Sequence, residues 1–262
     1  MSLKEKIKSL LPWPFLYSFR KLRSLSEDLP VLIPFLFNRT KTPTTFIQRL
    51  SLIIKCYRIS YSVDCPHMEN EMIKVMAAIF SLEPDLKGIV VEAGVYKGGS
   101  SAKISLAARL AKRELFIFDS FEGLPEHREI HGKNIFGGEA YFPPGSYAGS
   151  LEEVNANIRK FGAIEVCEFK KGWFEDTMPL LREPVGVGYL DADLESSTKT
   201  CLKYLYPLTV HGGVLLSQDG HLPWIIKLLD NEEFWQKQVG CGKPEMIGLG
   251  KEKLVIIKKD RV

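Results

Sequence analysis

The 262-residue sequence predicts an α/β fold in which helices cover both faces of a largely parallel sheet. Short runs rich in Val, Ile and Phe alternate along the chain with segments that have helical periodicity. This alternation is typical of parallel strands joined by crossover helices. Most of these runs also end in glycine or in polar residues, as expected where the carboxyl ends of parallel strands form a binding edge.

The alternation begins after residue 66. Residues 67–82 carry apolar side chains at helical spacing, and Pro84 stands just beyond, where a helix cannot continue. The β-rich run at 88–94 ends in glycine and precedes a predicted helix at 100–113. The next predicted strand lies at 114–120.

A long loop and a second alternating series follow. Residues 121–150 are rich in Gly, Pro and aromatic residues, which is typical of a functional loop. The helix predicted at 151–162 closes with Gly162, a residue that suits the C-terminal end of a helix. The same patterns predict strands at 163–169, 185–193 and 212–219, helices at 174–183, 197–208 and 222–237, and an antiparallel hairpin at 245–258.

The positive charge of the chain is confined to its N-terminal part. The whole sequence has a formal net charge of +3, but residues 1–60 hold 11 Lys and Arg against 3 Asp and Glu, a net charge of +8. The remaining 202 residues have a net charge of −5, so a nucleic-acid partner for the whole chain is not expected. We therefore predict an accessory arm with helical segments at residues 1–60 and one catalytic domain at residues 61–262.

Residues 1–40 allow two interpretations. Their Lys and Arg residues alternate with Leu, Trp, Phe and Tyr, and four prolines interrupt any long helix. Such a segment can lie on an anionic membrane surface. It can also pack on its own domain or on a partner subunit of a homo-oligomer, and amphipathic patterns favour this packing interpretation.

The cysteines and the hydropathy pattern predict a cytoplasmic protein. Five widely spaced cysteines with no CxxC pair indicate reduced thiols. The sequence shows neither a signal-peptide pattern nor an apolar run long enough to span a bilayer. Membrane contact is therefore expected only as a peripheral contact through residues 1–40.

Acidic and small polar residues gather at the predicted strand ends. An unpaired buried carboxylate is costly, and each such residue taken singly can be explained as a helix cap. Five strand ends of this kind together favour a binding site. The residues are Glu92 with Gly94, Asp119, the segment 170–173, Asp191 with Asp193, and Gln218 with Asp219.

The turn after the first strand, EAGVYKGGSSA, indicates the kind of ligand. It is not a GxGxxG motif, and the side chains of Tyr96 and Lys97 fall where a pyrophosphate needs bare backbone, which disfavours a nicotinamide-dependent reductase. Helix-start amides with the hydroxyl of Ser100 or Ser101 can hold a carboxylate, and Asp119 can accept hydrogen bonds from a ribose.

A ligand with a ribose and an amino-acid carboxylate but no phosphate is S-adenosylmethionine. Trp173 can stack on its adenine, although a role as a core tryptophan is equally consistent with the sequence. The predicted cofactor-binding residues are Glu92, Gly94, Tyr96, Gly98, Ser100, Asp119, Ser120, Trp173 and Asp191.

Six motifs in this order resemble the macrocin O-methyltransferase family. They are VVEAGVYKGGSSA, FIFDSFEGLPE, YAGSLEEVNANIRKFG, GWFEDTMP, YLDADLESSTKT and YLYPLTVHGGVLLSQDG, which together run from about residue 88 to residue 220. The resemblance implies a class I methyltransferase fold, with a mostly parallel seven-stranded sheet and a C-terminal antiparallel hairpin. It also implies S-adenosylmethionine-dependent methylation of sugar hydroxyls on antibiotics and related glycosides.

The resemblance further implies a Mg²⁺ site at Asp191, Gln218 and Asp219, with Asp193 as the general base. Gln218 stands where the family has an aspartate, and its amide oxygen can act as a neutral ligand that holds the metal more weakly. The alternatives are a metal site that uses Asp191 and Asp219 alone, and an active site without a metal. Glu195 and Gly220 replace aromatic residues of the family pattern, so we expect a different substrate-facing wall.

A second candidate for the base, and a lid, complete the predicted site. His221 directly follows the metal-pair strand and has an unperturbed pKa near 6.5, whereas Asp193 can also serve as a helix cap. Tyr141, Phe142 and Tyr147 can close on a sugar ring, or they hold their loop down.

The expected acceptor is a glycosylated natural product, a polysaccharide or a lipid-linked sugar. The alternatives are a small phenolic or amine acceptor, or a catalytically degenerate S-adenosylmethionine-binding or assembly protein.

Overall fold

A seven-stranded sheet lies at the centre of the structure, a computed structural model that describes residues 27–259. The strand order is β3-β2-β1-β4-β5-β7-β6, in which the first five strands are parallel and β7 is antiparallel to both of its neighbours. This confirms the predicted sheet and its C-terminal hairpin. The strands are β1 (Ile89–Ala93), β2 (Leu115–Asp119), β3 (Cys167–Lys171), β4 (Val185–Leu190), β5 (Thr209–Ser217), β6 (Met246–Ile247) and β7 (Val255–Lys258).

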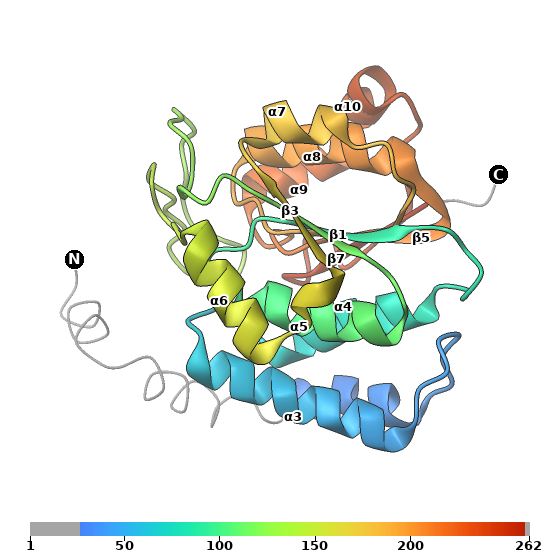
Figure 1. The fold of residues 1–262 in the computed structure, drawn as a ribbon. Helices are drawn as coiled ribbons and strands as arrows, with labels where there is room; N and C mark the ends of the chain where they lie inside the picture. Colours follow the sequence, from blue (N-terminus) through green and yellow to red (C-terminus); the bar gives the residue numbers. More distant parts are fainter. Residues whose placement is uncertain (1–26, 260–262) are drawn as a thin grey trace.

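Helices cover both faces of this sheet (Figure 1). Each face has its own apolar core, and the strands between them are largely buried because parallel sheets are covered on both sides. One face carries α4 (Glu69–Ser81), α5 (Gly99–Leu110) and α6 (Leu151–Phe161). The other face carries α7 (Phe174–Thr177), α8 (Glu195–Leu208), α9 (Pro223–Asp230), α10 (Glu232–Phe234) and the short turns η2 (Met178–Leu180) and η3 (Trp235–Val239).

An outer layer of two helices packs beyond α4 and α5 (Figure 1). Residues 27–37 form the first helix, and α3 (Phe46–Ser62) forms the second. Buried side chains of α3, such as Leu52, Cys56 and Ile59, join the core on this side of the sheet. Part of the predicted arm therefore packs on the domain, while residues 1–26 lie outside the described residues.

Three predicted elements differ from the observed ones, each for a local reason. The third strand begins only at Cys167, because residues Ile164–Val166 form a 3-10 turn. The helix predicted at 222–237 is divided, because Asn231 caps a new helix by accepting a hydrogen bond from the backbone of Phe234. The helix predicted at 174–183 is limited to α7 and a 3-10 turn.

The strand register brings the polar strand ends to one level. Ala93 pairs with Phe118 on one side and with Leu190 on the other, and Leu190 pairs with Ser217. The residue that follows each of these four therefore lies at the same edge of the sheet. These residues are Gly94, Asp119, Asp191 and Gln218. Among the described residues, no helix has the length and apolar character to cross a bilayer.

Candidate functional site

A cavity of about 270 Å³ lies at the carboxyl ends of the parallel strands. The turn after β1, the end of β2, the segment after β3 and the carboxylates after β4 and β5 form its inner wall. Residues from the long loop 121–150, which contains no helix or strand, form its outer wall. This is the position at which open α/β sheets bind ligands.

Gly94 makes the first turn possible. Its φ of +86° lies in the left-handed region, and a Cβ built on it would lie 2.0 Å from the carbonyl oxygen of Asp191. The backbone of β1 and the backbone after β4 therefore approach each other too closely for any side chain. The glycine is required by packing at the cavity wall as well as by its conformation.

We expect Gly94→Ala to lower the free energy of unfolding by about 4 kcal/mol or more, because the new methyl group overlaps fixed backbone. Gly137→Ala is the matched control: Gly137 has a φ of +82°, but nothing lies within 4 Å of the position that a Cβ would occupy there. This control should lose only about 1–2 kcal/mol. Urea unfolding measures the free energy of unfolding of both variants. Equal losses would show that the close approach of Gly94 to the Asp191 carbonyl does not affect stability.

Five predicted cofactor-binding residues line the cavity together with Gly94: Tyr96, Asp119, Ser120, Trp173 and Asp191. Asp119 accepts hydrogen bonds from the backbone of Val95 (2.8 Å) and of Phe121 (2.6 Å), which fixes its carboxylate at the end of β2. Burial raises the pKa of Asp119, and these two bonds oppose the rise. The Tyr96 hydroxyl donates to Asp64 at 2.9 Å.

Three other predicted cofactor-binding residues do not line the cavity. Glu92 and Ser100 are fully buried behind it. Burial raises the pKa of Glu92 to about 7, and the hydroxyls of Ser100 and Ser101 oppose this rise. Gly98 caps the start of α5 in a left-handed conformation and packs against Val154. These residues support the first turn from behind.

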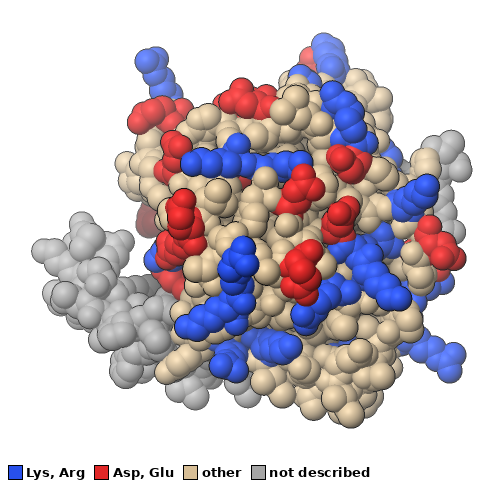
Figure 2. Space-filling model, in the orientation of Figure 1, with Lys and Arg blue, Asp and Glu red and all other residues tan. Residues whose placement is uncertain are grey.

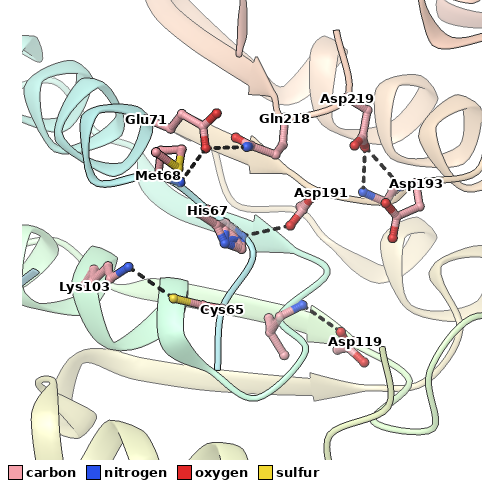
Figure 3. Close-up of polar contacts among 12 residues, drawn as sticks. Cys65, His67, Met68, Glu71, Lys103, Asp119, Asp191, Asp193, Gln218 and Asp219 are labelled. Atoms are coloured by element: carbon pink, nitrogen blue, oxygen red, sulfur yellow. Dashed lines mark hydrogen bonds and ion pairs between the residues drawn. The ribbon is translucent and has the colours of Figure 1, made fainter. Parts of the chain in front are cut away.

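Asp191, Asp193 and Asp219 bring three carboxylates together at the cavity wall (Figure 3). One oxygen from each lies within 4.8 Å of the others. Burial raises the pKa of Asp191 and of Asp193 well above the usual range, and the negative charge of Asp219 adds to this effect. Burial also raises the pKa of Asp219 to about 6. Such mutual repulsion is the electrostatic setting that a bound cation relieves.

The backbone of Asp193 is held in an uncommon conformation. Its φ is +59°, which costs a residue other than glycine on the order of 1–3 kcal/mol. The structure holds it there from two sides: the backbone N–H of Asp193 donates to Asp219 Oδ2 (3.0 Å), and its carbonyl accepts from the indole of Trp224 (2.9 Å). The conformation places the Asp193 side chain on the cavity wall.

Gln218 lies apart from the carboxylates. It is 1 % exposed, and its amide group donates to Glu71 Oε2 on α4 at 2.7 Å. Figure 3 shows this amide directed at Glu71, whereas the carboxylate of Asp219 is directed at the backbone of Asp193. The clustered carboxylates are those of Asp191, Asp193 and Asp219, and Gln218 does not line the cavity. Its amide nitrogen is held by Glu71, whereas its amide oxygen has no hydrogen-bond partner among the described residues.

Three residues near the carboxylates did not emerge from the sequence. His67 Nε2 lies 2.9 Å from Asp191 Oδ2 and is buried (Figure 3). Glu71 holds Gln218, and Lys253, from the turn between β6 and β7, lines the cavity near the carboxylates. Histidine and lysine have no distinctive local pattern here, so no sequence signal singled them out.

His221, the second candidate base, lies on the cavity wall. Burial and the nearby Lys253 lower its pKa to about 4. Its ring stacks on Phe136 of the long loop at a centroid distance of 6.2 Å. Glu195 and Gly220, which replace aromatic residues of the family pattern, do not line the cavity.

The long loop carries aromatic side chains over the cavity. Tyr141, Phe142 and Tyr147 all line it, and Tyr141 is 76 % exposed. Glu129 fixes the loop to the start of α8, because its carboxylate accepts hydrogen bonds from the backbone of Glu195 (2.8 Å) and of Ser196 (2.9 Å). A carboxylate in this position also complements the helix dipole.

A family model for macrocin-O-methyltransferase (TylF) matches residues 67–231. One curated relative is the 8-demethyl-8-(2,3-dimethoxy-alpha-L-rhamnosyl)-tetracenomycin-C 4'-O-methyltransferase of Streptomyces olivaceus. The two sequences are 33 % identical over 155 residues, which cover 53 % of this chain and 55 % of that protein. Demethyldecarbamoylnovobiocin O-methyltransferase of Streptomyces niveus is 31 % identical over 150 residues, covering 52 % and 53 % of the two chains. The chain therefore spans little more than half the length of these curated relatives.

Solved structures share the fold. The O-methyltransferase NovP superposes with a TM-score of 0.64 at 22 % identity, over 82 % of this chain and 100 % of that chain. The calicheamicin methyltransferase CalS11 gives a TM-score of 0.54 at 17 % identity, over 89 % and 91 % of the two chains. At this level of identity the likeness supports the architecture described above.

Proposed function

Because the chain belongs to the macrocin O-methyltransferase family, we propose that it is an S-adenosylmethionine-dependent O-methyltransferase whose acceptor is a sugar hydroxyl. The observation that carries this proposal is the cluster of Asp191, Asp193 and Asp219 on the wall of the strand-end cavity. The same cavity contains Asp119 at the end of the neighbouring strand β2. Asp119 supplies a carboxylate for cofactor binding, and the cluster supplies a carboxylate for proton removal.

The cofactor half of the cavity consists of Gly94, Asp119 and Trp173. When bound, S-adenosylmethionine supplies an activated methyl group on a sulfonium. Asp119 accepts hydrogen bonds from ribose hydroxyls, since a carboxylate has more acceptor sites than its two backbone donors occupy. The half-buried ring of Trp173 offers a face for the adenine.

Asp191 and Asp219 fit a Mg²⁺ ion. Mg²⁺ prefers oxygen ligands, commonly uses one or two carboxylates and keeps several waters, and two of the clustered carboxylates satisfy this need. Bound there, the ion would stabilise negative charge that develops on an acceptor hydroxyl. The contact with His67 orients the carboxylate of Asp191, and the backbone donors of Ala192 and Asp193 orient that of Asp219.

Asp193 acts as the general base in this proposal. Its carboxylate takes the proton of the acceptor hydroxyl, which is otherwise a poor nucleophile near neutral pH. Two hydrogen bonds hold the Asp193 backbone in place, so its side chain is oriented before the acceptor arrives.

A glycosylated acceptor agrees with the relatives and with the outer wall. The curated relatives are named as O-methyltransferases of a rhamnosyl tetracenomycin and of a novobiocin derivative. The exposed ring of Tyr141 with those of Phe142 and Tyr147 provides aromatic faces of the kind that pack on sugar rings. We include polysaccharide and lipid-linked sugars within this acceptor class.

Calorimetric titration with S-adenosylhomocysteine tests the proposed cofactor. We expect saturable binding of one molecule per chain, and no heat of binding from reduced nicotinamide dinucleotide, whose pyrophosphate needs bare backbone at the first turn. Tyr96 and its contact with Asp64 occupy that position. Failure of S-adenosylhomocysteine to bind, with the protein folded, would remove the basis of the proposal.

A further inference from the structure

The outer helices present a large apolar surface to solvent. Of the exposed large apolar side chains among the described residues, eight lie between residues 29 and 61. We call this surface the α3 face. Its residues are Leu29, Ile33, Phe37, Phe46, Ile47, Leu50, Ile54 and Tyr61.

The α3 face is continuous across the two helices. Leu29, Ile33 and Phe37 recur every four residues on the first helix, which places them on one side. The rings of Phe37 and Phe46 lie 5.5 Å apart and join this side to α3. Along α3 the face continues through Ile47 and Ile54, which are 76 % and 59 % exposed.

The opposite side of α3 already packs on the domain. Leu52, Ile53, Cys56 and Ile59 are buried in the core with α4 and α5. The helix is therefore held in place by its inner side, and its outer side is an additional apolar surface. A surface helix normally carries polar residues there. Exposed apolar patches of this extent usually mark an interaction site.

The charges within the segment that forms the α3 face are all positive. Residues 29–63 contain no Asp or Glu, whereas Arg39, Lys55 and Arg58 are exposed and Lys41 forms an ion pair with Glu83. Figure 2 shows blue and tan atoms at the lower edge of the molecule, where α3 lies in Figure 1. The preceding sequence is also basic and aromatic, since residues 1–26 hold six Lys and Arg against one Glu, together with Trp13, Phe15 and Tyr17.

We propose that the α3 face docks on an anionic membrane surface. An amphipathic helix that lies in the plane of a bilayer combines apolar side chains, which enter the headgroup region, with Lys and Arg, which contact anionic lipids. The α3 face has both features, and residues 29–63, which carry all of its apolar side chains, contain no acidic residue that would repel the lipid. A second copy of this chain fits less well, because a two-fold contact would bring these like charges together.

Co-sedimentation of the full chain with vesicles tests this proposal. Wild-type protein should sediment with vesicles of equal parts phosphatidylcholine and phosphatidylglycerol, and much less with phosphatidylcholine alone. The double variant Ile47→Glu, Ile54→Glu should reduce the ratio of bound to unbound protein at least about tenfold, because both charged side chains would enter the apolar layer. The control Leu180→Glu, at a 72 % exposed apolar residue on η2, should stay within about twofold of wild type.

A second variant keeps the test decisive if the first does not fold. Lys55→Glu, Arg58→Glu changes two exposed charges and should lower vesicle binding more at low salt than at high salt.

Absence of wild-type binding to anionic vesicles would overturn the proposal, as would an equal loss in Leu180→Glu. A dimeric mass by light scattering, lost in the Ile47→Glu, Ile54→Glu variant and without vesicle binding, would overturn it in favour of self-association. The proposal is independent of methyl transfer, so its failure leaves the proposed activity untouched.

Discussion

Asp193→Asn is expected to lower kcat by about 10²–10⁴-fold, the usual contribution of a positioned general base. The asparagine keeps the size of the side chain and tolerates a left-handed backbone, so the φ of +59° should persist. The backbone contacts with Asp219 and Trp224 are also retained, because both involve main-chain atoms of residue 193. The measurement is steady-state methyl transfer together with calorimetric binding of S-adenosylhomocysteine, whose affinity should change by no more than about twofold.

Glu195→Gln is the matched control for this prediction. Glu195 lies two residues further on, at the start of α8, and forms an exposed ion pair with Lys199. Such pairs contribute little, so kcat should stay within about twofold of wild type. A kcat of Asp193→Asn close to that of the control would show that another group accepts the proton.

Asp219→Asn is expected to weaken Mg²⁺ binding at least about tenfold, because it removes one unit of negative charge from the cluster. The amide oxygen can still accept from the backbone of Ala192 and Asp193, so the loop after β4 should keep its conformation. Gln218→Ala should change the Mg²⁺ affinity by no more than about threefold, since Gln218 does not line the cavity and its amide nitrogen donates to Glu71. Calorimetric titration with Mg²⁺ in the presence of S-adenosylhomocysteine measures both.

The comparison of these two variants distinguishes two arrangements of the metal site. A loss in Gln218→Ala as large as that in Asp219→Asn would mean that the amide oxygen of Gln218 is a ligand of the bound ion. Undiminished methyl transfer in the presence of EDTA would instead exclude any role for a metal ion. Asp230→Asn, at an exposed residue of α9 that pairs with Lys243, is the control for the loss of a carboxylate as such.

The sheet and the position of its polar strand ends could be predicted because their signals are local. A β-rich run that ends in an acidic residue is visible in a few residues, and the parallel register then places Asp119, Asp191 and Asp219 at one edge. The turn at Gly94 was predicted for the same reason, and the structure adds the close backbone approach that explains it.

The contacts that orient the site could not be predicted, because they join distant segments. His67 reaches Asp191 across 124 residues, and Glu71 reaches Gln218 across 147 residues. The sequence motif therefore suggested Gln218 as a neighbour of the carboxylates, while the packing of α4 against the sheet gives its amide a different partner. The same limit applies to Ser100 and Glu92, whose place behind the cavity depends on how α5 packs on β1.

The basic N-terminal part shows a similar limit. The net charge of +8 led us to treat residues 1–60 as one arm. Charge does not indicate which face of a helix is buried. The structure shows that α3 has one apolar side in the core and a second in solvent. The helical spacing of Leu52, Cys56 and Ile59 indicates the side that packs in the core. The apolar residues on the exposed side obscure this pattern in the sequence.

The most direct test of the proposed activity is methyl transfer from isotopically labelled S-adenosylmethionine to a panel of rhamnosylated and other glycosylated natural products, with the products identified by mass spectrometry. We expect one labelled methyl group on a sugar ring, formed by the wild-type enzyme with Mg²⁺ and formed far more slowly by Asp193→Asn. A label found on a phenolic or amine group, or product formation that Asp193→Asn leaves unchanged, would contradict the proposed activity.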